Sequence, residues 1–180
     1  AAMTDETRAK EAIDRLLAVL DLEEIDLNIY RGQNESDRPG RLFGGQVAAQ
    51  SLAAASRTAE NLPAHSLHGY FLRPGDPALP VVYSVDRIRD GRSFTTRRVV
   101  AQQHGKAIFN MSVSFHAAEP GYDHQFPMPD VPMPEDLMSR ADYAAKFIDQ
   151  IPEQFHPWVN RRVPIDTRYG RPPSFVPSEP

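Results

Sequence analysis

Cysteine is absent from the 180 residues, which excludes a disulfide framework, a thiolate metal site and a cysteine nucleophile. Uncharged stretches are short and rich in alanine and serine, so the sequence predicts no segment that spans a bilayer. Neither sign of charge dominates, because 24 acidic residues stand against 20 lysines and arginines and the formal net charge is only −4. Charged residues make up 24% of the chain and hydrophobic residues 41%. This balance is typical of a globular chain and provides no broad basic surface for nucleic acid.

Signatures of several catalytic classes are also missing. The chain contains no P-loop, no G-x-G-x-x-G, no G-x-S-x-G nucleophile elbow and no H-E-x-x-H. Mononucleotide binding and covalent serine hydrolysis therefore have no support in the sequence. The first residues lack the basic and then apolar run of a signal peptide, and we expect a cytoplasmic location.

Proline is scarce in the first two thirds of the chain and common in the last third. Five of the 17 prolines lie in residues 1–119 and twelve in residues 120–180. Because proline interrupts helices and sheets, we expect regular structure in the first part and an extended arm in the second. Apolar spacing predicts a single helix in this arm, over residues 135–151, which Pro152 ends. The predicted divisions are an N-terminal helix (1–26), a central domain (27–119) and a Pro-rich arm with one helix (120–180).

Two further helices are predicted in the first part of the chain. Ile13, Leu16, Leu17 and Leu20 follow the i, i+3, i+4, i+7 spacing of an amphipathic helix. Residues 47–55 carry no charge and are mostly alanine. A helix that is apolar all round is buried all round, so this second helix is expected in the centre of the domain.

Strand patterns lie on both sides of the uncharged helix in the sequence. A first strand is expected before it, over residues 27–32, and four more after it, over residues 65–73, 81–89, 94–103 and 107–116. In the last of these, Phe109, Met111, Val113 and Phe115 alternate with polar residues, and Asp90-Gly91 is a hairpin signal. Hairpin-linked strands form an antiparallel sheet whose apolar face needs cover. The predicted fold class is α+β, with a curled antiparallel sheet around one central helix.

The segment Phe43-Gly44-Gly45-Gln46 opens the uncharged helix. The first turn of a helix has unpaired N–H groups and a partial positive charge, and glycine lets a ligand reach them. Such an end can stabilise an oxyanion that develops on a carbonyl. The alternative is that the glycines only make a tight turn or allow close packing.

Histidine and arginine supply the other candidates. His65 and His68 lie three apart on a predicted strand and are expected on opposite faces, so they should not share a metal ion; either can be a general base or a structural histidine. Arg97 and Arg98 are likewise expected on opposite faces of their strand. One of them, Arg97 being our candidate, can bind a phosphate group of a substrate, and the alternative is pairing with neighbouring acids.

Taken together, the segments resemble one family. The matching pieces are Tyr30–Gln33, Phe43–Gln46, His65–Asp76, Arg89–Val99 and His104–Phe115, in the order and spacing of the family over about residues 13–135. Each piece is weak by itself, but the ordered set is specific. The chain resembles the N-terminal half of the acyl-CoA thioesterase II (TesB) family.

The resemblance implies a hot-dog fold, in which a sheet wraps around a long helix, and two such repeats in one chain. It implies hydrolysis of acyl-CoA to a free fatty acid and CoA, with no metal and no redox cofactor, and homo-oligomers formed by hot-dog packing. It makes His65 a candidate catalytic residue and Gly44, Gly45 and Gln46 candidate contacts for the thioester carbonyl.

The chain departs from the family pattern at its end. It stops at Pro180, and the family's catalytic aspartate, threonine or serine, and glutamine lie in a second repeat that matches nothing here. We therefore expect this chain alone to be inactive or feeble. One alternative is a non-catalytic single hot-dog that binds acyl-CoA or serves as an assembly module. Another is an enoyl-thioester hydratase, which is disfavoured because Glu60 is the first acid after Gln46.

Overall fold

The computed structural model describes residues 5–34, 40–60, 62–159 and 164–174. The chain divides into two compact units, which are described separately: Arg15–Tyr122, and Ala1–Asp14 together with Asp123–Pro180. No helix among these described residues is long and apolar enough to cross a membrane.

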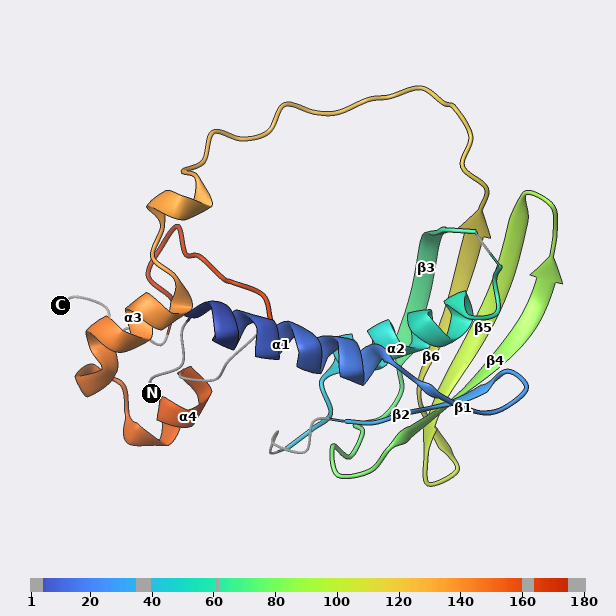
Figure 1. The fold of residues 1–180 in the computed structure, drawn as a ribbon, viewed down its shortest axis with the longest axis horizontal. Coiled ribbons are helices and arrows are strands. Elements are labelled where there is room, and N and C mark those ends of the chain that lie inside the picture. The colour runs from blue at the N-terminus through green and yellow to red at the C-terminus, as the bar shows by residue number, and fades with distance from the viewer. Residues whose placement is uncertain (1–4, 35–39, 61, 160–163, 175–180) are drawn as a thin grey trace. The chain divides into compact units, whose positions relative to one another are not determined.

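The larger unit is a six-stranded antiparallel sheet with one helix on it (Figure 1). The helix α1 (Asp5–Leu20) leads into the sheet, and α2 (Gly44–Ser56) lies between the second and third strands in sequence. The strands are β1 (Glu23–Asp26), β2 (Ile29–Gly32), β3 (Ala64–Phe71), β4 (Val81–Asp90), β5 (Phe94–Gln103) and β6 (Lys106–His116). Their order in the sheet is β1-β2-β4-β5-β6-β3, so β3 crosses over to pair with β6 at the far edge.

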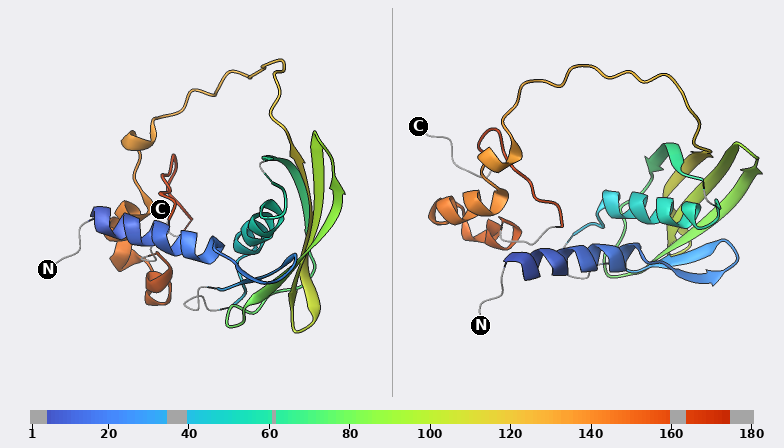
Figure 2. Two further views of the ribbon diagram at one scale, coloured as in Figure 1. Left: turned by 45° about the vertical axis from the view of Figure 1, so that its right-hand side comes forward. Right: turned by 45° about the horizontal axis from the view of Figure 1, so that its top comes forward.

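The sheet curls and α2 lies against its concave face (Figure 2). The alternation predicted for β6 is confirmed: Phe109, Met111, Val113 and Phe115 are all buried, facing α2. Ala54 and Ala55 of α2 are fully buried in the same core. Small side chains on the helix let the sheet approach its backbone closely.

The prediction that α2 is buried on all sides, which rests on its composition, is wrong for the described residues. Ala48, Ala49, Leu52 and Ala53 are only half-buried, and Gly45 and Ser56 are exposed at the two ends of the same stripe. The reason is geometric, because a single curled sheet covers one side of a helix and leaves the opposite side to other cover.

The beginning of the sheet also differs from the prediction. The strand expected over residues 27–32 is β2, from Ile29, and an unpredicted strand, β1, precedes it within the segment assigned to the N-terminal helix. Asn28, with a φ of 59°, turns the chain between them. All four residues of β1 are exposed, so it lacks the alternation that marks a strand in sequence.

The hairpins that join β4, β5 and β6 follow the predicted order. Between β5 and β6, His104 and Gly105 both have positive φ, as a two-residue turn requires. Between β4 and β5 the strand continues through Asp90, which pairs with Thr95, and the connection is Gly91, Arg92 and Ser93.

In the smaller unit, the single helix expected over residues 135–151 is broken. A 3-10 turn at Pro134–Asp136 is followed by α3 (Arg140–Phe147) and a second 3-10 turn at Ile148–Gln150. Ser139 starts α3 because its side chain accepts from the N–H of Asp142, whose carboxylate accepts in return from Ser139. This capping box is a stronger local start than the apolar spacing that led us to Glu135.

The chain after Pro152 holds more structure than the linker we predicted. It forms a 3-10 turn at Glu153–Phe155 and the short helix α4 (His156–Val159). Further on, the backbone of Tyr169 donates to Met138 and that of Arg140 donates to Thr167, so this segment returns along the start of α3.

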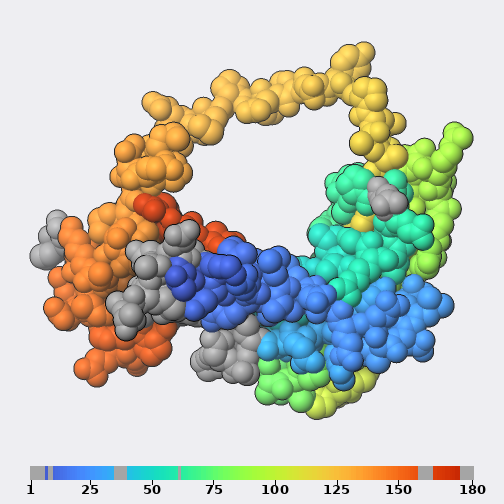
Figure 3. All heavy atoms as spheres, in the orientation of Figure 1, coloured from blue at the N-terminus to red at the C-terminus, as the bar shows by residue number. Residues whose placement is uncertain are grey.

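Residues 118–133 match the predicted extended arm. They form no helix or strand, and every one of them is exposed. Figure 3 shows the stretch, in yellow to orange, as a single file of residues. Several of the exposed side chains are large and apolar, among them Tyr122, Phe126 and Met128.

Candidate functional site

A cavity of about 430 Å³ lies in the larger unit where α2 begins. Its walls come from the start of α2, the end of β3 with the loop after it, and the start of β6. The lining residues are Arg41, Leu42, Gly44, Val47, Phe71, Leu72, Arg73, Pro74, Gly75, Ile108 and Phe109. The lining is apolar apart from the two arginines, which are exposed.

The glycines at the start of α2 serve close packing as well as access. A Cβ on Gly44 would lie 2.8 Å from a ring carbon of Phe71, and one on Gly45 would lie 2.6 Å from the ring of Phe43. The N–H groups of Gln46 and Val47 already donate to the Phe43 carbonyl. Gly44 and Gly45 precede these bonds, so their N–H groups form part of the positive end of the helix dipole.

The cavity can bind an apolar group but has little chemistry of its own. None of its lining residues, all of which are described, is an acid, a histidine, a serine or a threonine. No lining side chain can therefore remove a proton from water at neutral pH. Among the described residues there is also no group of three or more acidic or histidine side chains that could hold a metal ion.

Gln46 does not line this cavity. Its amide nitrogen donates to the side-chain oxygen of Asn34 at 2.8 Å, which ties the first turn of α2 to the chain that leaves β2. Of the three candidates for carbonyl contact, the structure therefore places Gly44 in the cavity wall, Gly45 beside it, and Gln46 in a supporting bond.

His65 lies on the other face of the sheet. Its Nε2 is 2.8 Å from Oγ of Ser114, and Ser114 points away from the core, between the buried Val113 and Phe115. His68 pairs in register with Ser112, which is on this same outer face. The prediction that the two histidines point to opposite faces is therefore wrong.

The cause is a β-bulge. The pairing of β3 with β6 shifts between Ala64 and Ser66, so that His65 is an extra residue in the strand. A bulge changes which face the following residues occupy relative to a simple alternation. The signal lies in the register with a strand about fifty residues away, so no local pattern reveals it.

The surroundings of His65 are aromatic. Its ring is 5.8 Å from that of Phe94 and 5.6 Å from that of His116, edge-on in both cases. His116 in turn stacks on Phe94 at 4.1 Å, and its Nε2 is 3.4 Å from a carboxylate oxygen of Glu119. Within this chain the structure does not bring His65 together with Gly44, because the sheet separates them.

Arg97 is buried, at 1% exposure. Its Nε donates to Oγ1 of Thr58 at 2.7 Å, and an Nη donates to the Thr58 carbonyl at 2.6 Å. It also donates to the carbonyls of Arg89 and Thr96 at 3.0 Å and to the carboxylate of Asp90. A phosphate group would have to displace these protein acceptors to reach the guanidinium.

Arg97 and Arg98 each pair with a neighbouring acid, Asp90 and Asp86, which is the alternative to phosphate binding that the sequence left open. Arg98 is exposed on the outer face and forms an ion pair with Asp86 at 2.6 Å. The hydrogen bond from Arg97 holds the pKa of the Asp90 carboxyl below its usual 3.8. Arg97 and Arg98 do point to opposite faces, as predicted.

The residues that sequence reasoning missed are buried amides. Gln50 of α2 is fully buried; its Oε1 accepts from the Tyr83 hydroxyl at 2.6 Å, and its Nε2 donates to the carbonyls of Val19 and Gln33 at 2.7 and 2.9 Å. Burial raises the pKa of Tyr83, which keeps the phenol a hydrogen-bond donor. The available signal was a glutamine inside an otherwise small and apolar helix, where an unpaired amide would be costly.

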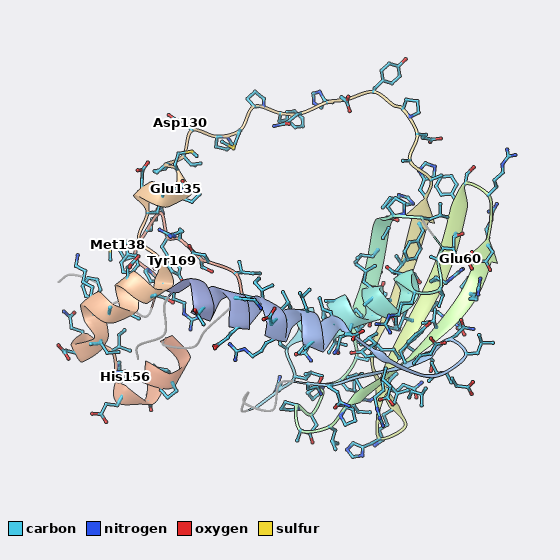
Figure 4. All side chains as sticks on the ribbon, in the orientation of Figure 1. Glu60, Asp130, Glu135, Met138, His156 and Tyr169 are labelled. Carbon is cyan, nitrogen blue, oxygen red and sulfur yellow. The ribbon has the colours of Figure 1, made fainter. Side chains whose placement is uncertain are left out.

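Glu60, the acid considered for hydratase chemistry, lies just past the end of α2 and is exposed (Figure 4). It is not among the residues that line the cavity. The structure therefore gives no carboxylate on α2 or in the cavity wall, within its described residues, that could protonate an enoyl thioester.

Comparison with solved structures defines the class of fold. The chain resembles a protein of unknown function with a hot dog fold from Alicyclobacillus acidocaldarius, with a TM-score of 0.63 and 26% identity over 69% of this chain and 48% of the other. A sheet of six antiparallel strands curled around one helix is that architecture. The fold is a hot-dog fold.

More similar relatives identify the family. Residues 34–116 match the model of the acyl-CoA thioesterase N-terminal domain. Acyl-CoA thioesterase II TesB2 from Mycobacterium marinum is 50% identical over 67% of this chain and 45% of its own, with a TM-score of 0.61. Mouse acyl-coenzyme A thioesterase 8 is 42% identical over 88% of this chain and 52% of its own. The chain belongs to the acyl-CoA thioesterase II (TesB) family.

Haemophilus influenzae acyl-CoA thioesterase 2 gives a similar match, 37% identical over 88% of this chain and 56% of its own. The chain thus spans about half the length of the curated relatives it matches.

Proposed function

We propose that this chain supplies the acyl-binding half of an acyl-CoA thioesterase, which hydrolyses acyl-CoA to a free fatty acid and CoA. The observation that carries the proposal is the apolar cavity that opens at the uncharged, glycine-containing start of α2. A cavity with this lining stabilises a hydrocarbon chain by removing it from water. The names of the relatives support acyl-CoA as the substrate class.

The start of α2 is proposed to receive the thioester carbonyl. Because Gly44 and Gly45 have no side chains, a carbonyl oxygen can approach their N–H groups closely. Negative charge that develops on this oxygen during hydrolysis is stabilised by N–H donors already in place. Gln46 contributes indirectly by fixing this turn through Asn34.

The CoA phosphates need cations near the mouth of the cavity. Arg41 and Arg73 are exposed there, whereas Arg97 would have to exchange several protein acceptors for a phosphate. We therefore propose the two exposed arginines as the better phosphate contacts, and Arg97 as a contact only if its present partners are displaced.

Proton transfer is proposed to depend on groups outside the cavity lining of this chain. The lining has no general base, and His65 lies across the sheet from Gly44. His65 keeps its proposed catalytic role only where the outer face of the sheet meets another repeat or another copy that holds a substrate. The chain alone is therefore expected to bind acyl-CoA and to hydrolyse it feebly.

Calorimetric titration of this chain with a saturated long-chain acyl-CoA and with free CoA tests the binding. We expect the acyl-CoA to bind and free CoA to bind much more weakly, because only the acyl group fills the cavity. Equal affinity for both ligands, or none for either, contradicts the proposed cavity. CoA release followed with a thiol reagent tests the second part, and robust turnover by the chain alone would show that its machinery is complete.

A further inference from the structure

The loop between β3 and β4 forms one wall of the cavity but has no regular structure. It runs through residues 72–80, contains prolines at 74, 77 and 80, and contributes Pro74 and Gly75 to the lining. Proline has no N–H, so only six of the nine loop residues can donate from the backbone. Leu72 and Arg73 donate to the Ile108 carbonyl of β6, and Ala78 and Leu79 donate to Asp76 within the loop. These bonds tie the first residues of the loop to β6, and they leave the N–H of Asp76 and the carbonyl of Leu79 to be held by partners on other elements.

Gln103, the last residue of β5, is such a partner. It is 7% exposed, and its side-chain amide both accepts from and donates to backbone groups of the loop. Its Oε1 accepts from the N–H of Asp76 at 2.8 Å, and its Nε2 donates to the carbonyls of Asp76 and Leu79 at 2.9 and 2.8 Å. Gln103 itself does not line the cavity.

The loop held in this way bonds directly to the segment that starts α2. The carbonyl of Gly75 accepts from the N–H of Leu42 at 2.9 Å. A Cβ on Gly75 would lie 3.1 Å from Leu42 and 3.2 Å from Ile108, so the wall is packed without spare room. A shift of the loop would therefore move Leu42, which lies two residues before Gly44.

A second amide closes the same network. Asn34 donates from Nδ2 to the Leu79 carbonyl, which also accepts from Gln103, and its Oδ1 accepts from Gln46 of α2 at 2.8 Å. The loop and the first turn of α2 are thus tied through side-chain amides on two different elements. Neutral amides give this network donors and acceptors without placing a charge beside the apolar cavity.

We propose that Gln103 is a positioning residue of the acyl-binding cavity. It fixes the loop of residues 72–80 against the start of α2 and so sets how long an acyl group the cavity accepts. The positioning follows from contacts within this chain, and only the identity of the ligand rests on the proposed function. The test separates the two.

The variant Gln103→Met keeps the size of the side chain and removes its hydrogen bonds. Gln102→Met is the matched control, because Gln102 is the neighbouring half-buried residue on the outer face of β5. Amide hydrogen exchange of both variants is measured by NMR at Leu42 and Asp76, beside the loop, and at Val99 and Met111 in the core. Binding of a short-chain and a long-chain acyl-CoA is measured by calorimetry.

We expect Gln103→Met to speed exchange at Leu42 and Asp76 by about 5- to 10-fold, the fold-change for a net loss of about 1–1.4 kcal/mol in local stability. Exchange at Val99 and Met111 should change much less. The ratio of the two acyl-CoA affinities should shift severalfold in Gln103→Met and stay unchanged in Gln102→Met.

A uniform rise in exchange across the core would show that Gln103 contributes only global stability and would overturn the proposal. So would unchanged exchange at Leu42, or an unchanged ratio of affinities in a variant whose loop exchanges faster. If the wild-type chain binds neither acyl-CoA while local exchange still responds as expected, the positioning role of Gln103 stands and the proposed function fails.

Discussion

Single polar residues decide how the uncharged helix sits in its sheet. The amide of Gln50 is fully buried yet has three partners, one on each of three other segments: Val19, Gln33 and Tyr83. A hydrophobic contact is satisfied in many orientations of a helix, whereas these three bonds are satisfied in one. Gln50 therefore sets the rotation and depth of α2 in a core that is otherwise made of small apolar side chains.

Replacing Gln50 with leucine should lower the free energy of unfolding by about 2–4 kcal/mol, because it removes a donor from the carbonyls of Val19 and Gln33 and leaves the buried Tyr83 hydroxyl without its acceptor. Tyr83→Phe removes only the hydroxyl and should cost about 1 kcal/mol. The double variant should cost less than the sum of the two, since both remove one shared bond. Urea unfolding measures all three, with the exposed Tyr70→Phe as a control that should change little. Strict additivity would contradict the coupling.

The two glycines at the start of α2 offer a matched pair. Gly44→Ala places a methyl group 2.8 Å from Phe71 in the cavity wall, whereas Gly45→Ala meets the exposed ring of Phe43 outside the lining. We expect Gly44→Ala to weaken binding of a long-chain acyl-CoA about 10-fold or more, and Gly45→Ala to weaken it much less. Calorimetry measures the affinities, and equal losses in both variants would argue against the cavity as the acyl site.

At the scale of elements, α2 is held at its two ends by different chemistry. Side-chain amides fix its first turn, and the buried guanidinium of Arg97 fixes the chain just past its last turn through Thr58. A cation near the C-terminus of a helix also complements the helix dipole. Arg97 lies on β5 and Asp90 on β4, so the same contact joins the helix to a hairpin.

Arg97→Lys should lower the free energy of unfolding by about 2–4 kcal/mol, because an ammonium group cannot reproduce the fork of bonds to Thr58. The neighbouring Arg98→Lys should cost no more than about 1 kcal/mol, since Arg98 makes an exposed ion pair with Asp86. Chemical denaturation of the two variants side by side provides the comparison. Similar costs for both would mean that burial of Arg97 adds nothing.

The contact between Arg97 and Asp90 predicts how the stability of the fold changes in acid. Because the folded-state pKa of Asp90 lies below 3.8, its carboxylate stabilises the fold above that pH, and the contribution is lost as the pH falls through the lowered pKa. Asp90→Asn has no such titration. The difference in melting temperature between wild type and Asp90→Asn should therefore be largest at neutral pH and should shrink in acid. A difference that does not depend on pH would refute this role for the Asp90 ionisation.

At the scale of the molecule, the larger unit has apolar surfaces that its own sheet and helix do not cover. The edge strand β3 exposes Leu67, Tyr70 and Phe71 at 55%, 60% and 64%, together with its unpaired backbone edge. The outer stripe of α2 is only half-buried. Exposed apolar edge strands favour pairing with another chain, and we propose that this chain forms homo-oligomers through its hot-dog unit.

Sedimentation velocity at micromolar concentration should therefore show dimers or larger species. Leu67→Lys, which places a charge on the edge strand, should shift the chain toward monomer. Ile88→Lys is the matched control, because Ile88 is equally exposed, at 57%, but lies on the interior strand β4. A clean monomer for the wild-type chain, or equal dissociation in both variants, would count against association through β3.

The amino-acid sequence by itself determined the class of fold. The alternation of β6 and the uncharged composition of α2 are local patterns, each read within about a dozen residues, and the structure confirms the sheet and helix they predict. The ordered motifs were enough to indicate the family, which the relatives confirm. The predicted roles of His65, Gly44, Gly45, Gln46 and Arg97 remain proposals.

Only the tertiary structure decided where the candidate side chains point and what they contact. His65 faces outward because of a bulge in its pairing with β6, and Arg97 is buried because Thr58, 39 residues earlier, supplies its acceptors. Gln103 reaches a loop more than twenty residues before it. Helix and strand periodicity depends on neighbours along the chain, whereas register and hydrogen-bond partnership depend on segments that meet only when the sheet closes around its helix.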